Sequence, residues 1–513
     1  MDPTSTELDI PSLTIPKYHA ALSNGTTTCT ALVTTYLARI TRYDPTLKSL
    51  LYINENALEI AAQKDKQTTH FLNNSHPLPP LHGVPIILKD NFTTHDTPTS
   101  AGVQALHALR TTTDSEVVSR LRLAGCIILA KANLHEFALH GTTTSSLGGQ
   151  TLNPFDATRT PGGSSGGTAA ALAGGLGLVG CGSDTVNSLR SPASACGIVG
   201  FRPSVGRVCT SGVVPVSSVQ DVVGPMGGSV EDVRVVFDVM KSGREEGEEE
   251  GEKGLGELEG GNSRRIRIGV LDAYFGLDDP REELTDELVH ENTIVQRVMH
   301  EALASIKTKA GADIELVHIN PSTHPDWRFA TLASTADTQV YEFRERLDTF
   351  LQSETVISPY HSLKQIAESG EYDQNAVTKV FTAALQNPER FSLASPGYQA
   401  RLERISVLKE GVRKCFEENG IDAMVYPHQR QLVVRIGSCV QPRRNGILAA
   451  LTGRPAICIP AGFSPSTCSA AQGVPVGLEL MGREDRDEEL LDLAERIEGI
   501  LQKREAPSME WIK

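Results

Sequence analysis

The chain has 513 residues, of which 39% are hydrophobic and 22% are charged, a composition that is ordinary for a soluble enzyme. Its formal net charge of −15 at pH 7 argues against nucleic-acid binding, which requires a basic surface. The acidic N-terminus and the lack of an apolar run of about 18 residues argue against a targeting peptide and a membrane span, so we expect a cytoplasmic protein.

The predicted elements alternate between helix and strand. Residues 28–40 read as an amphipathic helix that Thr28 can cap, and a second helix is expected at residues 55–69. Short apolar runs and helical stretches then alternate, which predicts an α/β fold with helices on both faces of a sheet. The strand candidates in this part of the chain are residues 84–88, 127–130 and 176–181, and the helix candidates are residues 116–124 and 168–173.

A Gly- and Glu-rich stretch at residues 242–262 interrupts this order. It offers little apolar surface to offset chain ordering, so we expect a flexible surface loop. A strand is predicted after it at residues 265–271, followed by a mainly helical region at residues 290–420 that carries no recognised motif. The chain should close with a helix at residues 488–503.

Neither a metal nor a cofactor is expected. The nine cysteines show no CxxC pair and no metal-ligand spacing, which predicts reduced thiols. His135 and His140 are five residues apart and would lie on different faces of a helix, unlike a zinc pair. The glycines of residues 175–180 satisfy G-x-G-x-x-G, but a helix precedes them and a strand follows, the reverse of a dinucleotide site.

Two segments carry the ingredients of nucleophilic catalysis. Glycines flank Ser164 and Ser165, and a helix that follows would aim free N–H groups at this loop; the alternative is a simple linker. Lys89 ends the apolar run 84–88, and burial there would depress its pKa toward that of a base; the alternative is a lysine that reaches solvent. Spacing alone leaves open a Ser-His-Asp triad with a distant histidine.

These segments together resemble the amidase signature family. The similarity is strong over residues 81–240, returns at residues 446–500 and is weak over residues 260–440. The segments that carry it are Leu81–Asn91, Pro98–Gly102, Ala130–Ala138, Asn153–Phe155, Gly162–Gly167, Asp184–Arg190, Gly197–Ser204 and Gly473–Gly482.

The resemblance implies a single three-layer α/β/α domain, with a central mixed sheet flanked by helices, across residues 1–513. It also implies hydrolysis of the C–N bond of a small-molecule amide, or of an ester, without a cofactor. Within the domain we expect N-terminal helices at 1–75, the signature core at 80–240, a variable substrate-shaping region at 265–440 and a C-terminal core at 441–505.

The family pattern also implies residue roles. Ser188 falls on the nucleophile, Ser164 on a bridging serine that follows a cis peptide bond, and Lys89 on the base. Backbone N–H groups would hold the oxyanion, and further residues would support the site. The oxyanion group comprises Thr185, Val186, Asn187 and Ser188, and the supporting group comprises Gly163, Ser165, Asp184 and Arg190.

One departure concerns the residues just before the nucleophile. Val186 and Asn187 stand where most members have two glycines, and valine tolerates positive φ poorly. We therefore expect an oxyanion loop that is built differently, with lower or altered activity. Two rival functions are a non-catalytic binding module and the glutaminase subunit of a tRNA-dependent amidotransferase. The sequence leaves open whether the chain forms a homodimer.

Overall fold

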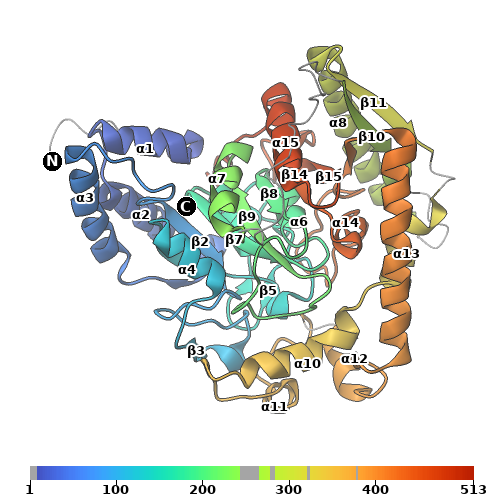
Figure 1. The fold of residues 1–513 in the computed structure, drawn as a ribbon, viewed down its shortest axis with the longest axis horizontal. Helices are drawn as coiled ribbons and strands as arrows, with labels where there is room; N and C mark the ends of the chain where they lie inside the picture. The colour runs from blue at the N-terminus through green and yellow to red at the C-terminus, as the bar shows by residue number, and fades with distance from the viewer. Residues whose placement is uncertain (1–7, 243–264, 278–283, 321–323, 377–378, 513) are drawn as a thin grey trace, which may run out of the picture.

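A mixed sheet of eleven strands runs through the centre of the computed structural model (Figure 1). The structure describes residues 8–242, 265–277, 284–320, 324–376 and 379–512. In pairing order the strands are β1 (Leu50–Ile53), β4 (Ile127–Ala132), β2 (Pro85–Lys89), β7 (Val179–Asp184), β9 (Val222–Gly227), β8 (Val199–Arg202), β14 (Ala456–Phe463), β15 (Pro475–Gly482), β13 (Ala423–Pro427), β10 (Ile266–Leu271) and β11 (Ile314–Ile319).

Parallel pairing is confined to two parts of this sheet. β2 is parallel to β4 and β7, and β10 is parallel to β11 and β13. The strands between these groups pair antiparallel. Every residue of β2, β4 and β7 is buried, as expected for strands that are covered on both faces. The expected mixed α/β sheet flanked by helices is confirmed.

Helices cover the sheet on both sides, and the described residues also form two separate sheets of two short strands each. The helices are α1 (Ile15–Ser23), α2 (Cys29–Leu47), α3 (Ala57–Asn73), α4 (Glu116–Leu123), α5 (Gly166–Ala173), α6 (Arg190–Cys196), α7 (Val230–Met240), α8 (Asp286–Ala310), α9 (Phe329–Thr335), α10 (Gln339–Leu351), α11 (Leu363–Ser369), α12 (Lys379–Gln386), α13 (Pro396–Asn419), α14 (Ile447–Thr452) and α15 (Asp487–Leu501). The short strands are β3 (Arg110–Thr111), β5 (Thr144–Ser145), β6 (Gly149–Gln150) and β12 (Val356–Ile357).

Strand β7 explains how helices approach the sheet from opposite sides. A β-carbon on Gly180 would lie 2.6 Å from the Thr168 methyl group of α5, so α5 packs directly on the strand backbone. The side chain of Cys181 points the other way, and its sulfur lies 3.9 Å from the Met240 sulfur of α7. The small residues of β7 therefore bring the start of α5 close to the sheet. This placement positions Ser164, which lies two residues before the first residue of α5.

The predicted N-terminal helices are confirmed, although both extend beyond their expected ends. The Thr28 side chain accepts a hydrogen bond from the Ala31 N–H and caps α2 as expected, but the helix runs on to Leu47. Helix α3 likewise continues to Asn73. No helix in the described residues is both long and apolar enough to cross a membrane.

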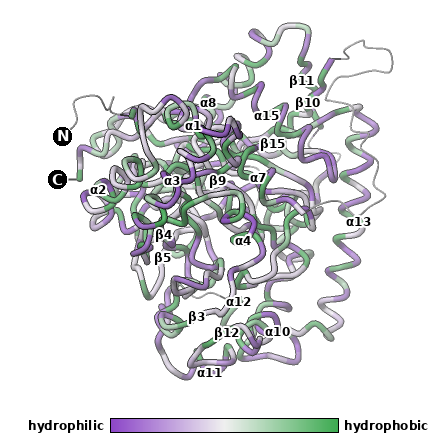
Figure 2. The backbone as a smooth tube through the Cα atoms, turned by 60° about the vertical axis from the view of Figure 1, so that its left-hand side comes forward, coloured by the Kyte–Doolittle hydropathy of each residue, from purple (hydrophilic) through white to green (hydrophobic). Residues whose placement is uncertain are grey.

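A separate helical group lies at one end of the molecule. Helices α10, α11 and α12 gather there with the β3–β12 pair, as Figure 2 shows. The Phe137 ring anchors this group, because its centroid lies 5.5 Å from that of Phe343 and 6.0 Å from that of Phe381. Helices α10 and α12 are thereby held against the loop that follows β4.

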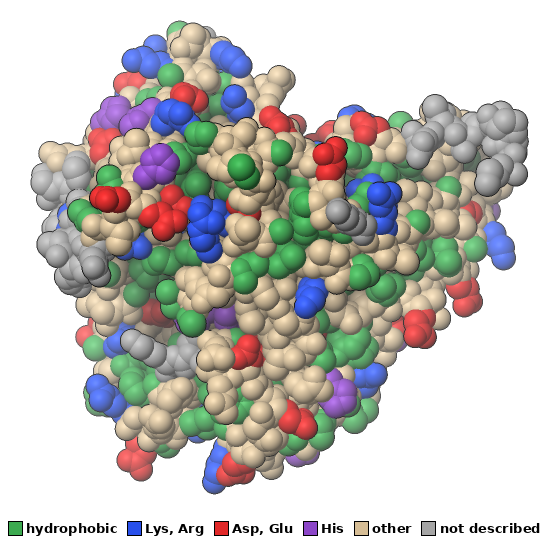
Figure 3. Space-filling view, turned by 180° about the vertical axis from the view of Figure 1, so that it is seen from behind, with side chains coloured by type: hydrophobic (Ala, Val, Ile, Leu, Met, Phe, Trp, Pro, Cys, Tyr) green, Lys and Arg blue, Asp and Glu red, His purple; other side chains and the backbone are tan. Residues whose placement is uncertain are grey.

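The acidic stretch predicted at residues 242–262 lies, except for Ser242, outside the described residues. On the face in Figure 3, the acidic and basic side chains are interspersed rather than gathered by sign. The division of the chain into the five expected segments stays a prediction.

Candidate active site

Lys89 is the last residue of β2 and is completely buried. Its Nζ lies 2.7 Å from Ser164 Oγ and 2.8 Å from Ser183 Oγ, with the Ser183 carbonyl oxygen at 3.4 Å. Burial lowers the pKa of Lys89 to about 7, and the more distant carboxylates of Asp184 and Asp221 only partly oppose this shift. Near neutral pH, a large fraction of Lys89 is therefore an uncharged amine that can accept a proton.

Ser164 lies on a tightly packed loop before α5. The peptide bond between Gly163 and Ser164 is cis, as the resemblance implies. The Thr143 hydroxyl fastens this loop, since it donates to the Gly162 carbonyl at 2.7 Å and accepts from the Gly166 N–H at 3.1 Å. A β-carbon on Gly163 would lie 2.7 Å from Thr143 Oγ1, which explains why glycine occupies that position.

Ser188 lies between β7 and α6, next to the Ser164 loop. The Ser165 N–H donates to the Ser188 carbonyl at 3.2 Å, and Ser165 Oγ donates to the Ser183 carbonyl at 3.2 Å. The structure thus brings Lys89 and Ser164 into direct contact and places the Ser188 backbone beside them. Within the described residues, Ser188 Oγ makes no hydrogen bond to Ser164 or to a histidine.

Asp184 and Arg190 fasten the loop that connects β7 to Ser188. Arg190 pairs with Asp184 at 3.1 Å and donates to the Val186 carbonyl at 2.7 Å. Asp184 also accepts from the Leu189 N–H at 3.0 Å and pairs with Arg202 at 2.9 Å. Although burial raises the pKa of Asp184, the guanidinium groups of Arg190 and Arg202 outweigh it and hold this pKa well below its usual range. Asp184 is therefore a buried carboxylate that braces the loop.

The residues that replace the expected glycines adopt ordinary backbone angles. Neither Val186 nor Asn187 has a positive φ, so the loop does not require the conformation that valine disfavours. Side chains hold the loop on both sides. The Thr185 hydroxyl donates to Asp221 at 2.6 Å, and Asn187 Oδ1 accepts from Arg444 Nη1 at 2.6 Å.

The backbone of this loop presents unused hydrogen-bond donors. Within the described part of the chain, the N–H groups of residues 185–188 donate no hydrogen bond. They lie between β7 and α6, at the wall of a cavity of about 680 Å³. N–H groups in this setting can bind a negatively charged oxygen.

The cavity is lined by residues from five segments of the chain. The predicted variable region contributes a large share of the wall, mostly through α9, the start of α10 and the loop before α12. The lining residues are Ala138, Leu139, His140, Thr185, Val186, Asn187, Ser188, Phe329, Ala333, Asp337, Gln339, Asn375, Val380, Cys439, Val440 and Arg444.

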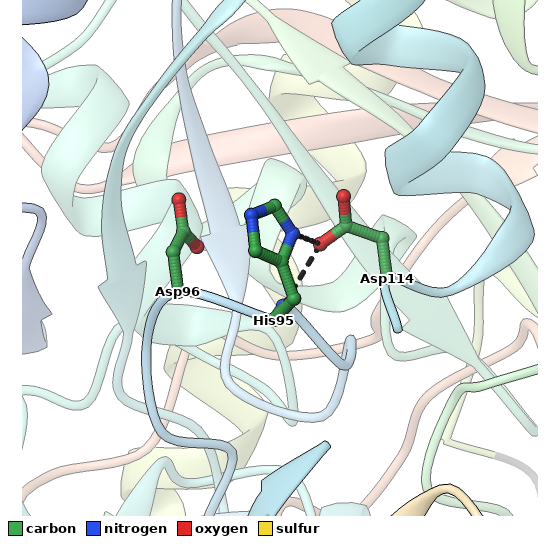
Figure 4. A group of neighbouring side chains, drawn as sticks. All are labelled: His95, Asp96 and Asp114. Atoms are coloured by element: carbon green, nitrogen blue, oxygen red, sulfur yellow. Dashed lines mark hydrogen bonds and ion pairs between the residues drawn. The ribbon is translucent and has the colours of Figure 1, made fainter. Parts of the chain in front are cut away.

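His95, Asp96 and Asp114 form a second group of polar side chains, shown in Figure 4. Their ligand atoms lie close enough together to suggest a metal site. However, Arg122 pairs with Asp96 at 2.8 Å and with Asp114 at 3.0 Å, so both carboxylates already share a guanidinium partner. We interpret this group as a surface ion-pair cluster.

A family model described as Amidase matches residues 31–491. The chain belongs to the Amidase family. A glutamyl-tRNA(Gln) amidotransferase subunit from Chloroflexus aurantiacus is 28% identical over 495 residues, which cover 92% of this chain and 93% of that protein. The suspected membership of the amidase signature family is thus confirmed, and the protein is an amidase-family C–N hydrolase.

Solved structures share the fold of this amidase-family chain. Native peptide amidase from Stenotrophomonas maltophilia aligns with a TM-score of 0.80 and 27% identity, covering 97% of this chain and 99% of that chain. The corresponding glutamyl-tRNA(Gln) amidotransferase subunit from Thermotoga maritima aligns with a TM-score of 0.69 and 23% identity, covering 98% and 99% of the two chains.

Sequence reasoning missed several residues around this amidase-family site. Arg202 and Glu479 lie within motifs that carry the resemblance, but no role was predicted for either. Both contact the ion pair of Asp184 and Arg190 that holds the loop before Ser188, since Arg202 pairs with Asp184 and Glu479 pairs with Arg190. Thr143 and Arg444 lie outside those motifs, and no sequence pattern indicated a role for them. Their contacts with the Ser164 loop and with Asn187 exist only in the folded chain.

Proposed function

We propose that this protein hydrolyses a linear carboxylic amide through an acyl-enzyme formed on Ser188. The observation that carries the proposal is the 2.7 Å contact between buried Lys89 and Ser164, beside the loop that bears Ser188. A lysine whose pKa is lowered to about 7 can serve as a general base at neutral pH. A serine hydroxyl is a weak nucleophile and requires such a base.

In the first half of the reaction, uncharged Lys89 accepts the Ser164 proton while Ser164 accepts the proton of Ser188. Rotation of the Ser188 side chain completes this link once substrate is bound. The Ser188 oxygen then bonds to the amide carbonyl carbon, and the carbonyl π electrons move onto its oxygen. Collapse of this intermediate breaks the C–N bond, and the amine leaves with the proton returned through Ser164.

Water completes the reaction by attacking the acyl-enzyme. Its proton passes through Ser164 to Lys89, and the collapse of the second intermediate releases a carboxylic acid. The proton then returns to the Ser188 oxygen. The N–H groups of residues 185–188 stabilise the oxyanion in both halves of the reaction. Loss of one such donor typically costs about 3 kcal/mol of transition-state stabilisation.

Hydrolysis of an amide panel tests this proposal. Aryl, fatty-acyl and short aliphatic amides should be compared for the wild-type protein and for Ser188→Ala, which we expect to abolish turnover of every substrate of the wild type. Ser191→Ala is the matched control, because Ser191 Oγ is buried near the start of α6 and has no hydrogen-bond partner among the described residues. Turnover that survives in Ser188→Ala would refute the nucleophile assignment.

A second candidate is a glutaminase subunit that supplies ammonia to a tRNA-dependent amidotransferase. The similarity to a glutamyl-tRNA(Gln) amidotransferase subunit over most of the chain favours it. The same Ser188 chemistry would act on the side-chain amide of glutamine. Glutamine hydrolysis by the chain, alone and with the partner subunits of such an amidotransferase, distinguishes this candidate from a free-standing amidase.

A third candidate function is that of a non-catalytic binding module with this fold. It predicts that a fluorophosphonate, which reacts with activated serines, leaves Ser188 unlabelled. Our proposal predicts covalent labelling at Ser188, and mass spectrometry of the peptide that contains it separates the two outcomes.

A further inference from the structure

Arg444 brings a guanidinium group to the wall of the cavity that Ser188 lines. Its Nη1 donates to Asn187 Oδ1 at 2.6 Å, so the guanidinium lies beside the residue that precedes Ser188. A β-carbon on Gly141 would lie 2.3 Å from Nη1, which leaves the group packed between that loop and Asn187. The Arg444 Nε is buried and has no hydrogen-bond partner in the part of the chain that the structure describes.

The charge of Arg444 lacks the counter-ion that neighbouring arginines have. Arg190 pairs with Asp184 and Glu479, and Arg202 pairs with Asp184. Within the described residues, no carboxylate lies within 4.0 Å of the Arg444 guanidinium nitrogens. Arg444 is half-buried, and a guanidinium that is partly desolvated without a counter-ion is unfavourable, so an anion that enters the cavity would gain a strong charge-assisted hydrogen bond.

The other polar groups of the cavity do not supply that anion. Asp337 also lines the wall, but its carboxylate accepts the Gln339 N–H at 3.1 Å and the Gln339 side-chain amide at 2.9 Å. Burial lowers the pKa of His140 to about 3, so this ring is neutral and adds no charge. Arg444 is thus the cavity-lining cation that remains unpaired among the described residues.

We propose that Arg444 binds the carboxylate of the substrate, and hence that the preferred substrates are amides that carry a carboxylate a few bonds from the scissile carbonyl. The inference rests on the proposed function of Ser188. Ser188, Asn187 and Arg444 line the same cavity, and the Arg444 guanidinium donates to the side chain of the residue that precedes Ser188, so a substrate whose carbonyl carbon meets Ser188 can present a nearby carboxylate to that guanidinium. Arg444 sets specificity and takes no part in bond breaking.

Matched substrates test this specificity. Succinyl-p-nitroanilide carries the carboxylate, and 4-methylpentanoyl-p-nitroanilide replaces it with an isopropyl group of similar shape. We expect the wild-type protein to favour the acidic substrate in kcat/KM. In Arg444→Gln the ratio of the two kcat/KM values should fall by about 10- to 100-fold, the usual effect of losing a hydrogen bond to a charged group.

Two further variants distinguish charge recognition from loop bracing. Arg444→Lys should recover part of the selectivity, because the ammonium keeps the charge but not the planar fork. Arg443→Gln removes the same charge one residue away, outside the cavity lining, and should leave the selectivity ratio unchanged. If the selectivity ratio is the same in the wild type and Arg444→Gln, the inference is wrong.

A binding assay separates this inference from the proposed function. Cys439 is exposed and lines the same cavity, whereas Cys468 is exposed outside its lining. Succinate, but not its neutral diamide, should slow the reaction of Cys439 with iodoacetamide, while Cys468 serves as the internal control. This protection should persist in Ser188→Ala, which cannot turn over substrate, and disappear in Arg444→Gln.

Together, the kinetic and protection assays can show a failure of the carboxylate site separately from a failure of the proposed hydrolysis. Protection of Cys439 without hydrolysis of either anilide would support Arg444 as the carboxylate site while the proposed hydrolysis fails. Hydrolysis of the neutral anilide with no preference for the acidic one, and no protection by succinate, would overturn the inference while the proposed function stands.

Discussion

Two buried lysines on neighbouring parallel strands have different surroundings. Lys89 ends β2, Lys131 lies on β4, and neither side chain is exposed to solvent. Lys131 Nζ lies 2.9 Å from the Asp90 carboxylate and also donates to the Pro98 carbonyl at 2.9 Å and to Thr99 Oγ1 at 3.0 Å. Among the described residues, Lys89 Nζ hydrogen-bonds only to hydroxyl and carbonyl oxygens.

The difference shows that the groups in contact with a buried lysine determine whether it acts as a structural cation or as a base. Burial lowers the pKa of both amines, but the Asp90 carboxylate opposes the loss of charge on Lys131 at close range. Lys89 has no carboxylate at hydrogen-bonding distance among the described residues, and its pKa is lowered to about 7. We therefore interpret Lys131 as half of a structural ion pair and Lys89 as a base.

The largest expected effect is on activity, through Lys89→Met. Methionine keeps much of the side-chain volume but cannot accept a proton, so kcat/KM should fall about a thousandfold, within the usual range for loss of a general base. The fold should be retained, as circular dichroism and gel filtration can check. Activity within tenfold of the wild type would show that Lys89 is not the base.

The matching change on the other strand should affect stability instead. Lys131→Met leaves Asp90 buried without its cation, and we expect the free energy of unfolding to fall by about 3–5 kcal/mol. Urea denaturation measures this loss. The double variant Lys131→Met/Asp90→Asn removes both charges and should recover most of the lost stability. A loss below about 1 kcal/mol in the single variant would contradict the ion-pair interpretation.

A smaller effect is expected on the pH dependence of kcat/KM when the hydroxyl of Ser183 is removed. Activity requires the uncharged amine, so kcat/KM should rise with pH through about 7 and level off above it. Ser183 Oγ lies 2.8 Å from Lys89 Nζ and favours the charged form by accepting a hydrogen bond. Ser183→Ala should therefore lower the pKa of Lys89 and move the midpoint down by about half to one pH unit.

The pH-rate profiles of the wild type and Ser183→Ala provide this measurement. Ser191→Ala is again the control, and its midpoint should match that of the wild type. A midpoint that stays in place or moves to higher pH in Ser183→Ala would argue against Lys89 as the titrating group.

The sequence predicted the parts of this site that depend on local pattern. The apolar run before Lys89 indicated a buried strand, and the glycines around Ser164 indicated a packed loop before a helix. The ion pairs that hold the loop before Ser188 could not be predicted, because no periodicity links Asp184 to Arg202 or Arg190 to Glu479. Arg190 and Glu479 are 289 residues apart in the sequence. The order of the eleven strands likewise depends on pairing between distant segments.

The loop before Ser188 shows a second limit of local reasoning. The presence of Val186 and Asn187 in place of two glycines suggested an oxyanion loop that is built differently. In the structure neither residue has a positive φ, and side-chain contacts to Asp221 and Arg444 hold the loop instead. Local propensity could not reveal these partners, because they come from other parts of the chain.

The most direct test of the account is the pH dependence of fluorophosphonate labelling at Ser188, measured for the wild type and Lys89→Met. We expect the label on Ser188, with a rate that rises about tenfold per pH unit below about 7 and levels off above it. Lys89→Met should react at least about a hundredfold more slowly and lose this dependence. Labelling of another residue, or equal rates and profiles in the two proteins, would contradict the account.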